Sequence, residues 1–245
     1  MLNEIMMELK NPNNSIIGVY GMGGVGKTKL VEQLAWQAEY NDRFFSVVAV
    51  ATITRSPDLE KIQDQIAHPL GMKFDKEAKE GRAMQLRKRI SNEKSILIIL
   101  DDVWEKFDLT EVGIPFGEDH KGCKLVVTSR DRNVLNSKMD IQKEFRLEVL
   151  HDEDSWKLFE KMAGEVVKDF NIKPIAVEVA KLCAGLPLLI VTVAKALRKK
   201  HVSDWKDALN ELKRFDQEGL HNKVYSTLEL SYNFLESEEL KLLFL

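Results

Sequence analysis

Near the start of the chain, a glycine-rich stretch has the residue types of a loop that holds phosphate. Residues 21–28 read Gly-Met-Gly-Gly-Val-Gly-Lys-Thr and match the pattern G-x-x-x-x-G-K-S/T. Glycines lack a Cβ, so consecutive backbone N–H groups can turn towards an anion. Lys27 can reach the outer phosphate oxygens, and the Thr28 hydroxyl can coordinate Mg²⁺. Contacts to a phosphate-bearing cofactor are predicted at Gly21, Gly23, Gly24, Val25, Gly26, Lys27, Thr28 and Lys29.

An acidic pair, Asp101 and Asp102, follows the apolar run 96–100, which is typical of a buried strand. Ligands of open α/β sheets lie beyond the carboxyl ends of the strands, so both carboxylates would face the crevice of the glycine-rich loop. We expect Asp101 to hold Mg²⁺ and Asp102 to orient the attacking water, which makes Asp102 and Lys27 the predicted catalytic residues. The alternative is that the pair only caps a following helix.

A third polar group, Ser129-Arg130-Asp131, follows the apolar run 124–128. The Arg130 guanidinium offers several donors to phosphate oxygens at once, so it could detect whether a γ-phosphate is present. The alternative is that Ser129 caps a short helix and Arg130 is solvated.

These polar groups need a sheet to bring them together, and the hydrophobic pattern predicts one. Apolar residues recur at helical spacing after the glycine-rich loop and predict a helix there. This context disfavours the alternative, in which the loop is only an exposed glycine-rich turn. Further helices are predicted near 58–70 and 83–91, and strands that alternate with helices indicate a parallel sheet and an α/β fold. The predicted strands are 16–20, 45–53 (buried on both faces), 96–100, 124–128 and 145–149.

After about residue 150 the pattern changes to helices only. Four helices are predicted, with Gly164 and Gly185 as stop signals and Pro187 at the first turn of the third helix. We therefore predict a nucleotide-binding domain at 1–150, a four-helix domain at 151–217 and an incomplete further domain at 218–245.

Composition excludes several classes of protein. The 245 residues carry 36 Lys and Arg against 39 Asp and Glu, a formal charge of −3, so no nucleic-acid partner is indicated. No apolar run is long enough to span a bilayer. Cys123 and Cys183 are far apart beside apolar stretches, which favours reduced thiols and a cytoplasmic location.

Several blocks in this order resemble the NB-ARC module of plant disease-resistance NLR proteins of the coiled-coil class. They are GMGGVGKT at 21–28, ILDDVW at 99–104, GCKLVVTSR at 122–130, CAGLPL at 183–188 and LELSYNFLESEELK at 228–241. The resemblance covers essentially the whole chain and implies a P-loop NTPase sheet flanked by helices, then a helical (ARC1-like) bundle and the start of a winged-helix (ARC2-like) subdomain.

The resemblance also implies a switch that holds ADP at rest and exchanges it for ATP on activation, which lets protomers assemble into a ring-like oligomer. Slow ATP hydrolysis would then reset the switch. Mg²⁺ would be bound by Thr28 and Asp101, Arg130 would detect the γ-phosphate, and Pro187 would pack against adenine. Lys29 stands where the family usually has a second threonine. Partners would be the nucleotide and the other domains of a full-length receptor, namely its coiled coil and leucine-rich repeats.

The family's glycine-arginine-glutamate segment and its methionine-histidine-aspartate motif do not occur in the sequence, so we expect a truncated part of such a receptor. Two alternatives to the switch stay open. One is an interaction module without turnover, and the other is a different P-loop enzyme, such as a kinase or a fast signalling ATPase.

Overall fold

The computed structural model of the chain describes residues 1–41, 44–74, 79–105, 108–136 and 141–215. It divides into two compact units, Met1–Leu147 and Glu148–Leu245, and each is described by itself. The segment 218–245, predicted above as the start of a winged-helix subdomain, lies outside the described residues.

The first unit is built on a five-stranded sheet, and every pair of neighbouring strands in it is parallel. The strand order is β2-β3-β4-β1-β5. The strands are β1 (Ile16–Tyr20), β2 (Val47–Thr52), β3 (Ile96–Val103), β4 (Cys123–Ser129) and β5 (Lys143–Arg146). The predicted α/β fold with a parallel sheet is confirmed, and the three strands that precede the predicted site residues, β1, β3 and β4, lie side by side at its centre.

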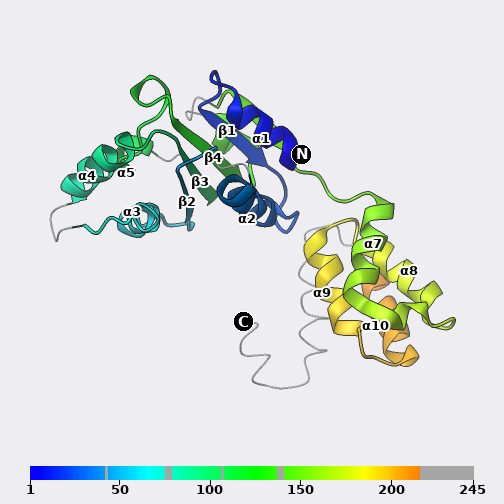
Figure 1. Ribbon diagram of the computed structural model, residues 1–245. Coiled ribbons are helices and arrows are strands. Elements are labelled where there is room, and N and C mark those ends of the chain that lie inside the picture. Colours follow the sequence, from blue (N-terminus) through cyan, green and yellow to red (C-terminus); the bar gives the residue numbers. More distant parts are fainter. Residues whose placement is uncertain (42–43, 75–78, 106–107, 137–140, 216–245) are drawn as a thin grey trace. The chain divides into compact units, whose positions relative to one another are not determined.

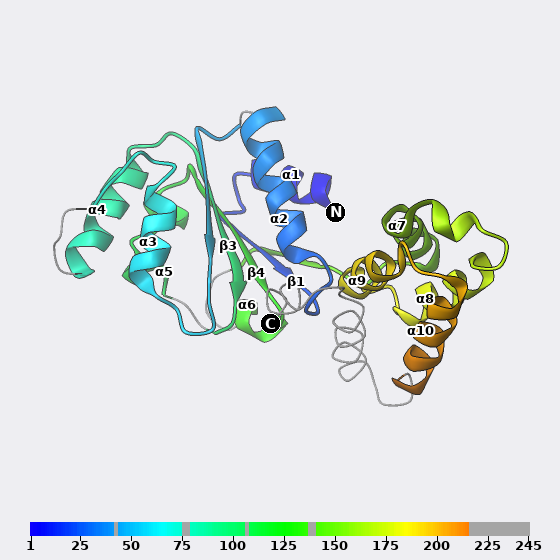
Figure 2. The same cartoon turned by 90° about the horizontal axis from the view of Figure 1, so that it is seen from below.

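Helices cover both faces of this sheet (Figures 1 and 2). Successive residues of a strand point to opposite faces, so Leu97 and Ile99 pack towards α1 and α2, while Ile98 and Leu100 pack into the core that includes residues of α3, α4 and α5. The helical segments are α1 (Leu2–Lys10), α2 (Lys27–Trp36) with a π-helical turn η1 (Gln37–Asn41), α3 (Leu59–Ala67), α4 (Lys79–Ser91), α5 (Leu109–Val112), η2 (Gly117–Asp119) and α6 (Arg132–Asn136).

Three elements differ from the sequence prediction. β2 is an edge strand, so Val50 is exposed and the prediction of burial on both faces is wrong. β3 continues past its apolar run through the acidic pair to Val103. β5 forms at Lys143–Arg146 rather than at 145–149, because its charged side chains are tolerated on the other edge strand.

The second unit is helical over its described residues. It comprises α7 (Asp152–Ala163), η3 (Gly164–Lys168), α8 (Lys173–Leu182), α9 (Pro187–Leu197) and α10 (Val202–Phe215). Its core contains the fully buried Trp205, whose ring lies edge-on to Phe159 with the centroids 6.1 Å apart. Pro187 is the first residue of α9, as a missing N–H at that position allows. Within the described part of the chain, no helix is both long and apolar enough to cross a membrane.

Candidate phosphate-binding site

The glycine-rich loop joins β1 to α2 and takes a backbone shape that requires glycine. Gly24 and Gly26 have φ angles of 78° and 104°, and Gly26 is the N-cap of α2. At Gly21 the constraint is space, because a Cβ would lie 2.4 Å from the Leu147 carbonyl oxygen. The Gly21 N–H also donates to the Ser129 carbonyl at 3.2 Å, which ties the loop to the end of β4. The loop therefore opens at a helix N-terminus, where backbone N–H groups favour an anion.

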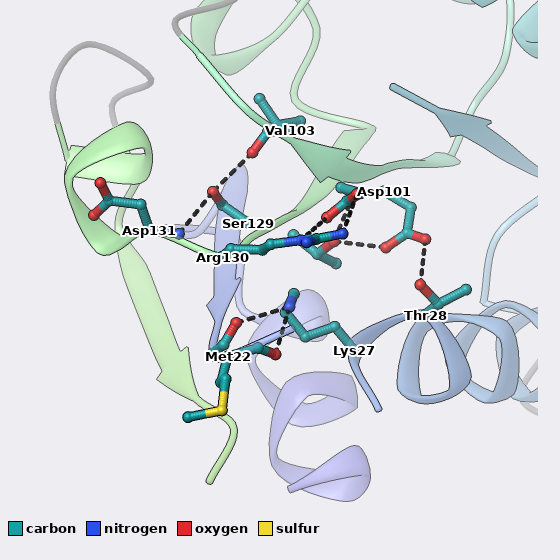
Figure 3. Close-up of polar contacts among 11 residues, drawn as sticks. Met22, Lys27, Thr28, Asp101, Val103, Ser129, Arg130 and Asp131 are labelled. Carbon is teal, nitrogen blue, oxygen red and sulfur yellow. Dashed lines mark hydrogen bonds and ion pairs between the residues drawn. The ribbon is translucent and has the colours of Figure 1, made fainter. Parts of the chain in front are cut away.

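Lys27 is folded back over this loop. Its Nζ donates hydrogen bonds to the carbonyl oxygens of Gly21 at 2.7 Å and of Met22 at 3.0 Å (Figure 3). Only 7% of the residue is exposed, and this burial is the main reason why the pKa of Lys27 lies below its usual value. The nearby charge of Asp102 opposes that shift, whereas Arg130 adds to it. A buried ammonium at the loop is placed to meet phosphate oxygens that reach it.

Asp101 lies between two threonine hydroxyls and is 3% exposed. Thr28 Oγ1 donates to Asp101 Oδ2 at 2.8 Å, and Thr128 Oγ1 donates to Asp101 Oδ1 at 2.6 Å. Figure 3 shows Thr28 pointing from the start of α2 towards this carboxylate. A carboxylate and a hydroxyl are oxygen ligands of the kind that Mg²⁺ prefers, so the two residues fit the metal site predicted for them.

Asp102 has an unusual backbone, because β3 carries one extra residue against β4 at this point. Leu100 pairs with Val127 and Val103 pairs with Ser129, so three steps on β3 match two on β4. This bulge gives Asp102 a φ of 60°, and its N–H donates to Thr128 Oγ1 at 2.9 Å. The acidic pair thus sits inside the end of the strand and does not cap a helix.

Arg130 forms an ion pair with Asp102. Its Nε and Nη2 lie 3.3 Å from Asp102 Oδ1 and Oδ2, in two parallel contacts. A Cβ on Gly23 would lie 3.4 Å from Arg130 Nη1, so the guanidinium extends over the glycine-rich loop. The alternative in which Arg130 is merely solvated does not describe this geometry, although half of its side chain is exposed.

Ser129 does not act as the helix cap. Its hydroxyl donates to the Val103 carbonyl at 2.7 Å and so closes the bulge of β3. The side chain of Asp131 caps the turn that follows, accepting from the Asn133 N–H at 2.8 Å.

Two residues near the site were missed by sequence reasoning. Thr128 is fully buried and bonds to both acidic residues, and the signal for it was a hydroxyl at the end of an otherwise aliphatic strand. The ring of Trp104 lies under Arg130, with the guanidinium carbon 4.3 Å from its centroid. Nothing in the local sequence pattern pointed to this contact.

Two further cofactor contacts were predicted, at Lys29 and Pro187. The Lys29 ammonium binds Glu32 Oε2 at 2.6 Å on the exposed face of α2, with 83% of its side chain accessible. Pro187 belongs to the second unit, so its contact with adenine stays a prediction.

A parallel sheet whose first strand runs through a glycine-rich loop into a helix, with an acidic pair at the end of another strand of the same sheet, defines a P-loop NTPase fold. The chain belongs to the NB-ARC family, because residues 1–169 match the NB-ARC domain. Membership implies nucleotide binding.

The relatives are disease resistance proteins of Arabidopsis thaliana. The chain is 38% identical over 244 residues to disease resistance protein At4g27190, covering 97% of this chain and 25% of that protein. It is 32% identical over 253 residues to disease resistance protein RPS5, covering 100% of this chain and 28% of that protein. The chain thus spans about a quarter of the length of these relatives.

A solved structure supports the fold. The chain aligns over 98% of its length with 33% of a signal transduction ATPase with numerous domains (STAND) from Pyrococcus horikoshii, at a TM-score of 0.56 and 18% identity. At this level of identity the likeness concerns the fold alone.

Proposed function

We propose that this chain is the nucleotide-operated switch module of a plant disease-resistance protein, with ADP bound at rest and ATP bound when active. The observation that carries the proposal is the hydrogen bond of 2.8 Å between Thr28 and Asp101, because these two residues would supply oxygen ligands to Mg²⁺. ATP hydrolysis would be slow and would reset the switch. In the active state, we expect the cytoplasmic receptor that contains this module to form oligomers.

Each residue of the site would have its own role in binding or hydrolysis of the nucleotide. The Lys27 ammonium would exchange its two carbonyl partners for phosphate oxygens. Thr28 and Asp101 would hold Mg²⁺, which neutralises phosphate charge when it is bound. Asp102 would orient the attacking water and accept its proton, since its carboxylate is more exposed than that of Asp101.

Arg130 would contribute to the difference between the two nucleotide states. Its guanidinium now binds Asp102, and a γ-phosphate would compete for the same donors. Moving a two-state equilibrium from 1:99 to 99:1 takes about 5.5 kcal/mol of differential binding. Charge-assisted hydrogen bonds are worth roughly 1.5–3 kcal/mol each. Arg130 would give up its bonds to Asp102, so Lys27 and Mg²⁺ at the extra phosphate would supply part of that difference.

The test is to purify the full chain without added nucleotide, denature it and identify what is released by chromatography. We expect ADP close to one per chain, and we expect Lys27→Ala to lose it. Lys61→Ala is the matched control, because Lys61 is an exposed lysine on α3, paired with Asp58. A chain that is empty and cannot bind ADP with Mg²⁺ would contradict the switch and favour an interaction module. Fast phosphoryl transfer to an added acceptor would instead indicate a kinase.

A further inference from the structure

Trp104 is the first residue after β3, and its position is unusual for a tryptophan. The side chain is large and apolar, yet 36% of the residue is exposed. The ring face meets two cations, with the guanidinium carbon of Arg130 at 4.3 Å from the centroid and that of Arg55 at 5.8 Å. Both distances lie within the range in which a ring face attracts a cation. The exposed indole is therefore attracted to two arginines, and one of them, Arg130, belongs to the candidate site.

The Arg130 guanidinium is confined from three directions. Asp102 accepts from two of its donors, the ring of Trp104 turns its face towards the guanidinium carbon, and the Gly23 backbone lies close to Nη1. The contacts with Asp102 and with Trp104 use different properties of the guanidinium. A carboxylate occupies N–H donors, whereas a ring face attracts the positive charge and occupies no particular donor. Asp102 can therefore be replaced by another anion while the contact with Trp104 persists.

This difference matters because arginine has a long and flexible side chain. An arginine that is fixed before the ligand arrives loses less freedom on binding, which strengthens the bonds that it forms. The ring of Trp104 can keep the guanidinium over the glycine-rich loop while its donors pass from Asp102 to a phosphate. A diphosphate lacks the γ-phosphate that Arg130 would bind, so it would gain nothing from the arrangement.

We propose that Trp104 is a positioning residue that holds Arg130 for the γ-phosphate and so raises the affinity of this site for a nucleoside triphosphate relative to its affinity for a diphosphate. The inference rests on the proposed function, since it concerns the residue that would distinguish ATP from ADP. Trp104 would act through Arg130 and would not itself contact the nucleotide.

The test measures two dissociation constants by calorimetry in Mg²⁺, one for ADP and one for a non-hydrolysable ATP analogue. We expect Trp104→Leu to weaken binding of the analogue by about fivefold, the size of an exposed cation–π contact, and to change ADP binding by less than about twofold. Trp104→Phe should restore most of the loss, because a phenyl ring still offers a face to the cation. Trp36→Leu is the matched control, since Trp36 is 51% exposed on α2 and its ring lies beside Tyr40.

A double-mutant cycle with Arg130→Ala separates positioning from packing. If Trp104 acts through Arg130, then Trp104→Leu should no longer change the ratio of the two constants once Arg130 is gone. Equal weakening of both nucleotides, no weakening of either, or an undiminished effect without Arg130 would overturn the inference. If the Trp104→Leu variant has no cooperative thermal transition, Trp104→Met takes its place in the experiment. Methionine fills more of the space of the indole but has no ring. A wild-type chain that binds neither nucleotide would contradict the proposed function instead.

Discussion

The hydroxyl of Thr28 donates a hydrogen bond of 2.8 Å to the carboxylate of Asp101, although the two residues are 73 positions apart in the sequence. This bond links the start of α2 to the end of β3. The two residues that would bind Mg²⁺ are thus already in contact through the oxygens that the metal would use.

The first prediction concerns that carboxylate. Asp101→Asn keeps the size of the side chain but removes the charge, so we expect ADP affinity in Mg²⁺ to fall by about tenfold or more. Affinity measured in excess chelator should change little, because the metal contributes nothing there. Asp64→Asn is the control, since Asp64 pairs with Arg82 on the surface. An equal loss with and without Mg²⁺ would contradict the assignment.

The second prediction concerns Thr128, whose hydroxyl serves both acidic residues. Thr128→Val preserves the shape but leaves a buried carboxylate oxygen and the Asp102 N–H without this partner. We expect the free energy of unfolding in urea to fall by about 1–3 kcal/mol. Thr192→Val should cost less than about 0.5 kcal/mol, because that hydroxyl only bonds the Leu188 carbonyl within α9. Similar losses in both variants would show that Thr128 has no special role.

The third prediction concerns Gly185, which joins α8 to α9. It has a φ of 71°, and a Cβ there would lie 2.2 Å from the Leu150 carbonyl oxygen. We expect Gly185→Ala to lower the free energy of unfolding by at least about 2 kcal/mol, from backbone strain together with the clash. Gly71→Ala measures the backbone strain alone, since Gly71 has a φ of 63° and nothing lies within 4 Å of the added Cβ. We expect this variant to lower the free energy of unfolding by about 1 kcal/mol. Thermal unfolding of the two variants gives the comparison.

The fourth prediction concerns Cys123, which is fully buried in β4. Burial raises the pKa of its thiol from 9.0 to about 12. The folded chain then keeps a proton that the unfolded chain releases, so stability from this group is full below pH 9 and is lost as the pH rises towards 12. Relative to Cys123→Ala, the wild type should lose roughly 1.4 kcal/mol for each pH unit in that window.

Thiol reactivity gives an independent measurement of the same burial. Cys123 and Cys183 are both buried, so neither should react with a thiol reagent at pH 8 until the chain unfolds. Rapid modification of Cys123 in the native chain would contradict its placement in the core.

The sequence was informative wherever a short local pattern decides the structure. The glycine-rich loop needs only neighbouring residues to be recognised, and β3 and β4 were visible as unbroken apolar runs because both of their faces are buried. The edge strand β5 was misplaced because its charged residues carry no such pattern. The predicted family was confirmed, because residues 1–169 match the NB-ARC domain and disease resistance protein RPS5 aligns with the whole chain.

What the sequence could not show depends on pairing between distant residues. The bulge at Asp102 exists only in the register of β3 against β4, and the roles of Thr128 and Trp104 follow from it. The pairing of the Lys29 side chain with Glu32 on the surface of α2 was likewise not visible in the motif, and the cofactor contact predicted for Lys29 stays a prediction.

The left-handed backbone of Asp102 limits which residues can replace it without strain. Asparagine and glycine adopt such a conformation readily, whereas β-branched residues do so at a high cost. A change to asparagine would therefore remove the second carboxylate and leave the strand end intact. With the role proposed for Asp102, a single nucleotide change in the gene would abolish hydrolysis while the chain continued to fold, so turnover and nucleotide recognition could diverge.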